Sequence, residues 1–108
     1  MDKQLNRIKG LLGLCRKAGK SGSGEFQCEE AIRRRTARLV LIAGDASDNT
    51  RKRFHDRCSF YHIPIYDVPF TKEELGQAMG LEARSCAAVC EEGLARLIQT
   101  ELEERSKR

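Results

Sequence analysis

A continuous apolar run in the middle of the chain, Leu39 to Ala43, restricts the possible folds more than any other feature. Its five residues include β-branched side chains and no polar side chain. A strand of this kind is buried on both faces of its sheet, so helices must cover both faces. The run therefore predicts a central strand between two helical layers.

Helical and extended patterns alternate on both sides of this run. The apolar periodicity predicts helices over residues 3–18, from Gly24 or Glu25 to about Arg35, from Ser47 or Asp48 onward, from Thr71 to Gly80, and along a face with Leu94, Leu97, Ile98 and Leu102. Strands are expected at residues 63–68 and 86–90, and residues 21–24 are expected as a turn or a brief strand. Such alternation predicts an α/β fold, a three-layer α-β-α sandwich.

Short-range signals mark several helix ends. Gly19 is expected to cap the first helix, and Ser23 to cap the second. Thr71 and Glu74 have the spacing of a capping box. Within the second helix, the favourable i, i+4 ion pairs are expected to be Glu29–Arg33 and Glu30–Arg34.

Charge is distributed unevenly along the chain. Twenty Lys and Arg residues oppose 16 Asp and Glu residues, which gives a net charge of +4. The basic residues concentrate in residues 1–57, whereas residues 67–104 are richer in acids. A basic half indicates a polyanion partner, and the alternative is a charged face that only keeps the protein soluble.

The cysteines and the lack of long apolar runs limit both location and chemistry. The five cysteines show no CxxC and no zinc spacing, and no signal peptide is recognised. We therefore expect reduced, buried thiols in a cytoplasmic protein that has no metal and no cofactor. No apolar run approaches the roughly 20 residues of a membrane helix, so no membrane partner is expected.

The stretch from Gly13 to Glu25, GLCRKAGKSGSGE, is the one most suited to holding phosphates. A phosphate-binding P-loop requires G-x-x-x-x-G-K-[ST], and Gly19-Lys20-Ser21 supplies its end. The first glycine would then fall at residue 14, which is Leu14, and the segment follows a helix, whereas a P-loop follows a strand. The pattern therefore disfavours a small nucleotide-binding enzyme.

The same stretch suits the backbone of a nucleic acid better. The N-terminus of the helix that begins at Gly24 or Glu25 presents free backbone N–H groups and the positive end of its dipole. Arg16, Lys17 and Lys20 are expected alongside it. Glu25 has two interpretations: it accepts hydrogen bonds from base N–H groups, or it only stabilises the helix dipole, by about 0.3–1 kcal/mol.

Several blocks occur together in an informative order: GLCRKAGK, SGSGE, ARLVLIAGDASDNTRKR, CSFYHIPI, ELGQAMGLEAR and AAV. With these blocks the chain resembles, over about residues 5–102, the kink-turn RNA-binding ribosomal protein family of the L-seven-Ae type, and most of all its bacterial, ribosome-associated YlxQ-like members. The resemblance implies a sandwich around a small mixed sheet, and an activity of binding without catalysis. Family members grip the kink-turn, a sharp RNA bend in which sheared G·A pairs adjoin a bulge.

The resemblance also implies where RNA would bind. The family motif is Gly, any residue, Asn, Glu, two residues of any kind and Lys, and it falls on Gly22, Gly24, Glu25 and Cys28. Gly24 replaces the asparagine and Cys28 replaces the lysine. Because charged hydrogen bonds contribute about 1.5–3 kcal/mol, weaker or altered RNA binding is expected, with Lys20 as a partial substitute.

A second implied element is the loop after the fourth predicted helix, which comprises Leu81, Glu82, Ala83 and Arg84. In relatives an apolar residue of this loop packs against the kinked bases, and core packing is the alternative for Leu81. Lys72 occupies another position at which relatives contact RNA. Ser47 lies where some relatives carry an acidic contact, which this chain lacks.

These observations predict a non-enzymatic protein with one RNA-binding domain over residues 1–108 and a frayed tail at residues 105–108. We expect it to bind kink-turn-like RNA, in ribosomal RNA or a ribosome-assembly intermediate, with Lys20 and Arg84 at backbone phosphates. His55 and His62 lie in no nucleophile pattern and are expected on the surface. The alternatives are a protein–protein adaptor of the same fold and the nucleotide-binding protein considered above. The sequence does not set the oligomeric state, and we favour a monomer.

Overall fold

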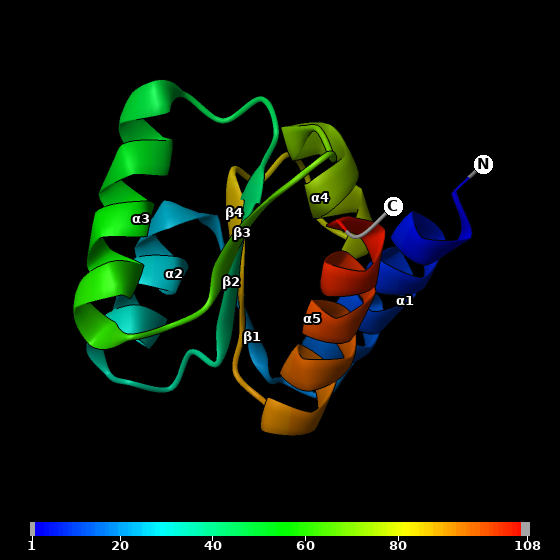
Figure 1. Ribbon diagram of the computed structural model, residues 1–108, viewed down its shortest axis with the longest axis horizontal. Helices are drawn as coiled ribbons and strands as arrows, with labels where there is room; N and C mark the ends of the chain where they lie inside the picture. Colours follow the sequence, from blue (N-terminus) through cyan, green and yellow to red (C-terminus); the bar gives the residue numbers. More distant parts are fainter. Residues whose placement is uncertain (1, 107–108) are drawn as a thin grey trace.

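The central strand is fully buried, as its composition predicts. The computed structural model describes residues 2–106, and strand β2 (Leu39–Ala43) is buried along its whole length. Leu39, Leu41 and Ala43 pack on one face of the sheet, and Val40 and Ile42 pack on the other. Because both faces carry apolar side chains, helices cover both faces (Figure 1).

Four strands form one small mixed sheet in the order β1-β4-β2-β3. Strands β1 (Ser21–Ser23) and β2 each pair antiparallel with β4 (Cys86–Val89). Strand β3 (Ile65–Val68) pairs parallel with β2. The predicted α/β class, the three layers and the mixed sheet are therefore confirmed.

Within residues 2–106, five helices form the two outer layers. Helices α2 (Gly24–Arg33) and α3 (Asp48–Tyr61) cover one face of the sheet. Helices α1 (Lys3–Lys17), α4 (Lys72–Ala78) and α5 (Glu92–Ser106) cover the other (Figure 1). In this part of the chain no helix has both the length and the apolar character needed to span a bilayer.

The last helix buries the predicted face except at Leu97, since Leu94 packs partly buried against the core. Ala95, Ile98 and Leu102 are buried, whereas Leu97 is 55% exposed, so the expectation for Leu97 is wrong. Leucines occur on two sides of this helix, and packing against α1 selects one of them. Helix α5 also continues through Ser106, while the last two residues of the expected frayed tail, 107 and 108, lie outside the described residues.

Strand ends and one ion pair differ from the sequence prediction. His62 adopts a left-handed φ of 59° and ends α3, so residue 63 completes a turn and β3 begins only at Ile65. Glu30 pairs with Arg34 at 3.4 Å, as predicted. Glu29 instead pairs with Arg53 of α3, and Arg33 pairs with Glu30. The predicted pairing of Glu29 with Arg33 is therefore wrong.

The helix-capping predictions for Gly19 and Thr71 are both confirmed. Gly19 has a φ of +68°, the left-handed conformation of a helix terminator, directly after the C-cap of α1. Thr71 and Glu74 form both hydrogen bonds of a capping box at the start of α4. These short-range signals succeed because each depends on residues within one turn.

The loops gather at two opposite ends of the sheet. The end where β1, β2 and β3 finish and β4 begins is here called the upper end. The strand pairing places four residues there: Ser23, Ala43, Val68 and Cys86. Figure 1 shows this end at the top, with the start of α3 and all of α4 beside it. The lower end is the opposite one, where β2 begins and β4 finishes.

Candidate nucleic-acid interface at the upper end

The N-terminus of α2 opens the candidate site. Gly24 leaves β1 with a φ of +82°, a conformation that lets the chain turn sharply into the helix. Ser23 is the N-cap residue, as predicted, but its side chain forms no capping hydrogen bond. Its hydroxyl lies 3.4 Å from Nε of Arg84, which acts as donor. The first turn of α2 therefore lacks a side-chain cap from Ser23, and backbone N–H groups remain for a ligand.

Glu25 lies exposed in this first turn and pairs with Arg53 of α3. Arg53 also places its Nε 3.0 Å from Oε1 of Glu29. The hydrogen bond to the Glu25 carboxylate raises the pKa of the Arg53 guanidinium, which stays charged. Arg53 contacts Oε1 of Glu25, and a carboxylate has two acceptor oxygens, so the second oxygen remains for a donor from a ligand.

The loop from Leu81 to Arg84 is pressed against α4. A Cβ added at Gly76 would lie 1.8 Å from the carbonyl oxygen of Glu82, so only glycine permits this approach. Leu81 is half-buried against the core beneath α4, whereas Glu82 and Ala83 are exposed. Both interpretations of Leu81 are thus compatible with its position, since one part packs and another part faces solvent.

Arg84 connects this loop to the start of α2. Its Nη1 donates to the carbonyls of Glu82 at 3.3 Å and Ala83 at 2.9 Å, and its Nε approaches Ser23. Its aliphatic Cδ would lie 3.5 Å from a Cβ at Gly24. A guanidinium has five N–H donors, so two are left for a phosphate.

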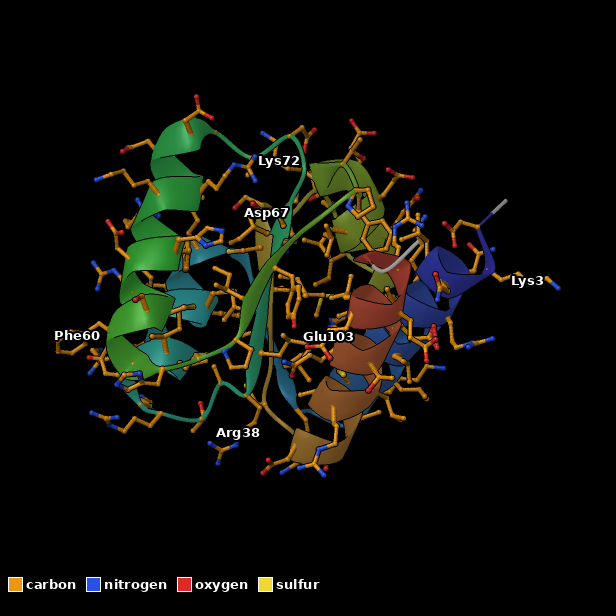
Figure 2. The ribbon with its side chains drawn as sticks, viewed as in Figure 1. Lys3, Arg38, Phe60, Asp67, Lys72 and Glu103 are labelled. Atoms are coloured by element: carbon orange, nitrogen blue, oxygen red, sulfur yellow. The ribbon has the colours of Figure 1, made fainter. Side chains whose placement is uncertain are left out.

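Two hydrogen bonds donated by main-chain N–H groups connect three upper-end loops. The backbone N–H of Arg84 donates to the carbonyl of Lys72 at 2.9 Å. The backbone N–H of Lys72 donates in turn to the Asp45 carboxylate at 2.8 Å. Lys72 is exposed, and Figure 2 shows it at the upper end of the molecule. The loops that follow β2 and β3 and the loop that precedes β4 therefore form one connected surface.

Lys20 lies away from this surface. Its carbonyl accepts from the backbone N–H of Cys90 at 2.8 Å, at the lower end of the sheet. Strand β1 separates it from Gly24, so the expected position of Lys20 beside the helix N-terminus is wrong. Arg16, expected in the same cluster, donates from Nη1 to the carbonyl of Met79 at 2.8 Å.

Cys28 and Gly22 of the implied motif lie below the surface. Cys28 has no exposed area, and its thiol points to the carbonyl of Gly22 at 3.8 Å. A hydrogen bond to Cys86, together with burial, raises the pKa of Cys28. The motif therefore contributes Gly24 and Glu25 to the surface, while Gly22 and Cys28 support them from beneath.

Arg51 and Arg53 are upper-end residues whose individual positions the sequence did not single out. Arg51 donates to the carbonyls of Gly44 and Ala46, both at 3.1 Å, and pairs with Asp67 at 3.1 Å. Both arginines belong to the basic run 51–53, which is visible in the sequence. The position of each residue around the helix decides which members of such a run face α2 and the upper loops. The helical periodicity of the sequence is the signal that could have identified them.

The thiols and acidic groups show no metal-binding arrangement within residues 2–106. All five cysteines are free; four are buried and Cys90 is half-buried. Burial raises the pKa of Cys15 to about 11 and that of Cys58 to about 12, which keeps both thiols protonated. Buried, protonated thiols of this kind are poor nucleophiles.

A family model described as the ribosomal protein L7Ae/L30e/S12e/Gadd45 family matches residues 6–98. The chain belongs to this family. The match covers all four strands, the start of α2, the loop from Leu81 to Arg84 and the first half of α5. The resemblance inferred from the separate sequence blocks is thereby confirmed.

Two relatives named RNA-binding protein YlxQ are similar to most of the chain. The protein of Bacillus subtilis (strain 168) is 42% identical over 85 residues, which are 79% of this chain and 84% of that protein. The protein of Enterococcus faecium is 36% identical over 93 residues, 84% of this chain and 88% of that protein. The chain therefore resembles YlxQ-type members of the family in particular.

Two solved structures share the fold. A protein of unknown function from Bacillus halodurans C superposes with a TM-score of 0.84 at 30% identity, covering 89% of this chain and 96% of that chain. The Giardia lamblia 15.5kD RNA binding protein gives a TM-score of 0.75 at 18% identity, covering 96% and 88%. At the lower identity the likeness concerns the architecture alone.

Proposed function

We propose that this protein binds structured RNA with a kink-turn-like bend, through the surface formed by the start of α2 and the loop from Leu81 to Arg84. The observation that carries the proposal is the position of Glu25, an exposed carboxylate at an uncapped helix start beside Arg84. A carboxylate repels phosphate, so its use in a nucleic-acid site is to accept hydrogen bonds from base N–H groups. Membership of the family and the names of the YlxQ relatives support RNA as the ligand.

Each side chain has a distinct role in the proposed complex. Glu25 accepts from exposed guanine N–H groups at the bend, and Arg53 holds it in place. Arg84 and Lys72 contact backbone phosphates on the two sides of the bend. The exposed part of Leu81, together with Ala83, packs against splayed bases, because unstacked RNA bases offer apolar faces.

The departures from the family motif point to weaker binding than the complete motif provides. Gly24 supplies no side-chain amide, and Cys28 supplies no cation because it is buried. Single modules of this kind bury roughly 600–1,000 Å² of protein surface, an area that the connected upper-end loops are suited to provide. We place the RNA in the ribosome or an assembly intermediate, in the cytoplasm, with the protein acting as a monomer and without catalysis.

The test is equilibrium binding to a kink-turn RNA and to a straight duplex of equal length, across a salt series. The proposal expects tighter binding to the bent RNA at every salt concentration. Equal, weak binding to both RNAs would indicate only nonspecific charge attraction. Absence of RNA binding combined with a stable protein partner would favour the adaptor function instead.

A further inference from the structure

A cleft of about 500 Å³ opens at the lower end of the sheet, opposite the surface described above. Its walls come from the segment before β2, the end of α3 and the first turns of α5. Its charged lining comprises Arg35, Arg38, Arg96 and Glu92. Figure 2 shows Arg38 at the foot of the molecule and Lys72 at its upper end. The two surfaces therefore lie at opposite ends of the strands.

The three arginines of this cleft carry more positive charge than the single carboxylate of its lining, Glu92, compensates. Arg38 donates from Nη1 to the carbonyl of Arg35 at 3.4 Å, and Arg35 lies 5.0 Å over the ring of Tyr61. Within residues 2–106, neither Arg35 nor Arg38 forms an ion pair with a carboxylate. Arg96 pairs only with Glu92, at 3.4 Å between two largely exposed side chains. A cleft lined by an excess of guanidinium groups over carboxylates is suited to phosphate groups.

An exposed aromatic ring lies next to the cleft. Phe60 is 75% exposed, and its ring centroid is 5.1 Å from that of Tyr61 in an edge-to-face contact. Tyr61 itself lines the cleft, so Phe60, which is outside the lining, contacts a ring of the cleft wall. Figure 2 shows Phe60 pointing away from the body of the molecule at α3. A basic groove beside an accessible aromatic face is the combination that binds single-stranded nucleic acids, since any base can stack on the ring.

We propose that this lower cleft binds a single-stranded RNA segment. Phosphates contact Arg35, Arg38 and Arg96, and a base stacks on Phe60. One protein molecule then holds a bent RNA at its upper end and a flanking or separate strand at its lower end. The inference goes beyond the proposed function and shares with it only the choice of RNA as the polyanion. An acidic protein segment would use the arginines but would leave the stacking face unused.

The test uses the full-length, isotope-labelled protein and a mixed-sequence single-stranded RNA of roughly ten nucleotides, within the usual site size for such binding. Added alone, or after saturation with a minimal kink-turn RNA, the oligonucleotide should shift the backbone amide signals of residues 35–38, 60–63 and 92–99. Phe60→Ala should weaken oligonucleotide binding about tenfold. Arg38→Gln with Arg96→Gln should lower the salt slope by about 1.4, and both variants should retain their affinity for the kink-turn RNA.

A control with the same change in charge is Lys3→Gln with Arg57→Gln. Lys3 is exposed and far from the cleft, and Glu29 keeps Arg53 as its partner when Arg57 is neutralised. Equal losses in this control would reduce the effect to general charge attraction and overturn the proposal. Shifts confined to α2 and residues 81–84, or equal displacement by a polyglutamate peptide, would also overturn it. A failure to prefer bent RNA would count against the proposed function alone.

Discussion

Glu25 and Arg53, 28 residues apart in the sequence, form an ion pair that joins the start of α2 to α3. The pair lies partly exposed, with 45% of the Glu25 side chain and 36% of the Arg53 side chain accessible. Exposed pairs of this kind contribute about 0.2–1 kcal/mol to stability, so its importance for the fold is small. Its effect is to orient a carboxylate that stays accessible at the start of α2.

Glu25→Ala is expected to weaken binding to kink-turn RNA by tenfold or more. The reason is the loss of charge-assisted hydrogen bonds to base N–H groups, which contribute about 1.5–3 kcal/mol. Binding to a straight duplex should stay unchanged or strengthen slightly, because a negative charge is removed. Fluorescence anisotropy with both RNAs measures the difference.

Glu29→Ala is the matched control for this variant. Glu29 also pairs with Arg53 and carries the same charge, but it lies one turn further along α2. It should reduce the affinity for the bent RNA by less than Glu25→Ala does. Equal effects of the two substitutions would mean that net charge, and no specific contact, explains the result.

Arg84→Gln should weaken binding to bent RNA severalfold more than Lys20→Gln. Arg84 lies beside the start of α2, whereas Lys20 lies at the other end of β1, next to Cys90. Both substitutions remove one positive charge, so general electrostatics affects them alike. If Lys20→Gln caused the larger loss, the placement of the RNA at the upper end would be wrong.

Gly24→Asn should tighten binding to kink-turn RNA between two- and about tenfold. Asparagine tolerates a positive φ better than most residues, and a Cβ at this site meets Arg84 Cδ at an ordinary 3.5 Å. The added amide can form one net hydrogen bond of about 0.5–1.5 kcal/mol. Isothermal titration with wild type and variant checks the gain.

Cys28→Lys, which would complete the same motif, should not tighten binding. Cys28 has no exposed surface, so a lysine ammonium there must be buried without a partner or push α2 away from the sheet. A marked loss of stability in urea denaturation is expected. A stable variant with stronger RNA binding would show that position 28 can reach the surface.

Gly76→Ala should destabilise the protein by at least about 1–3 kcal/mol and weaken RNA binding as well. Its Cβ would overlap the carbonyl of Glu82, which must move together with the loop from Leu81 to Arg84. Gly10→Ala in α1 is the control, since a Cβ there has nothing within 4 Å. That variant should be as stable as wild type or more stable by up to about 1 kcal/mol in urea denaturation.

Stability should fall as the pH rises above 9. Burial raises the pKa of Cys15 to about 11 and that of Cys58 to about 12 from an ordinary value of 9.0. Between pH 9 and these raised pKa values, the folded protein keeps protons on both thiols that the unfolded chain loses. Deprotonation at high pH therefore favours unfolding. The stabilising contribution is complete below pH 9 and declines progressively toward the folded pKa values.

Urea midpoints between about pH 8 and 11 measure this effect. Cys58→Ala should flatten the decline, because it removes one of the buried groups whose pKa is raised. Ser59→Ala, at an exposed neighbour, should leave the decline unchanged. A profile that Cys58→Ala does not alter would exclude Cys58 as a source of the pH dependence.

The sequence by itself determined the layered fold and the short-range features of the molecule. The apolar run Leu39–Ala43 required two covered faces, and Thr71 and Gly19 marked helix ends, because these effects act through adjacent residues or a single periodicity. The family motif likewise pointed to Gly24 and Glu25. Each of these inferences needs no knowledge of what lies across the sheet.

Only the tertiary structure decided which of the marked residues share a surface. Lys20 is four residues from Gly24 in sequence but lies beyond the other end of β1, because an extended strand rises about 3.3 Å per residue. Glu29 has Arg33 one turn away on its own helix, yet its carboxylate pairs with Arg53 of α3. Arg53, Arg84 and Glu25 meet at one end because strand order and direction place their three segments there. Long-range pairing of this kind depends on packing, which local sequence patterns do not encode.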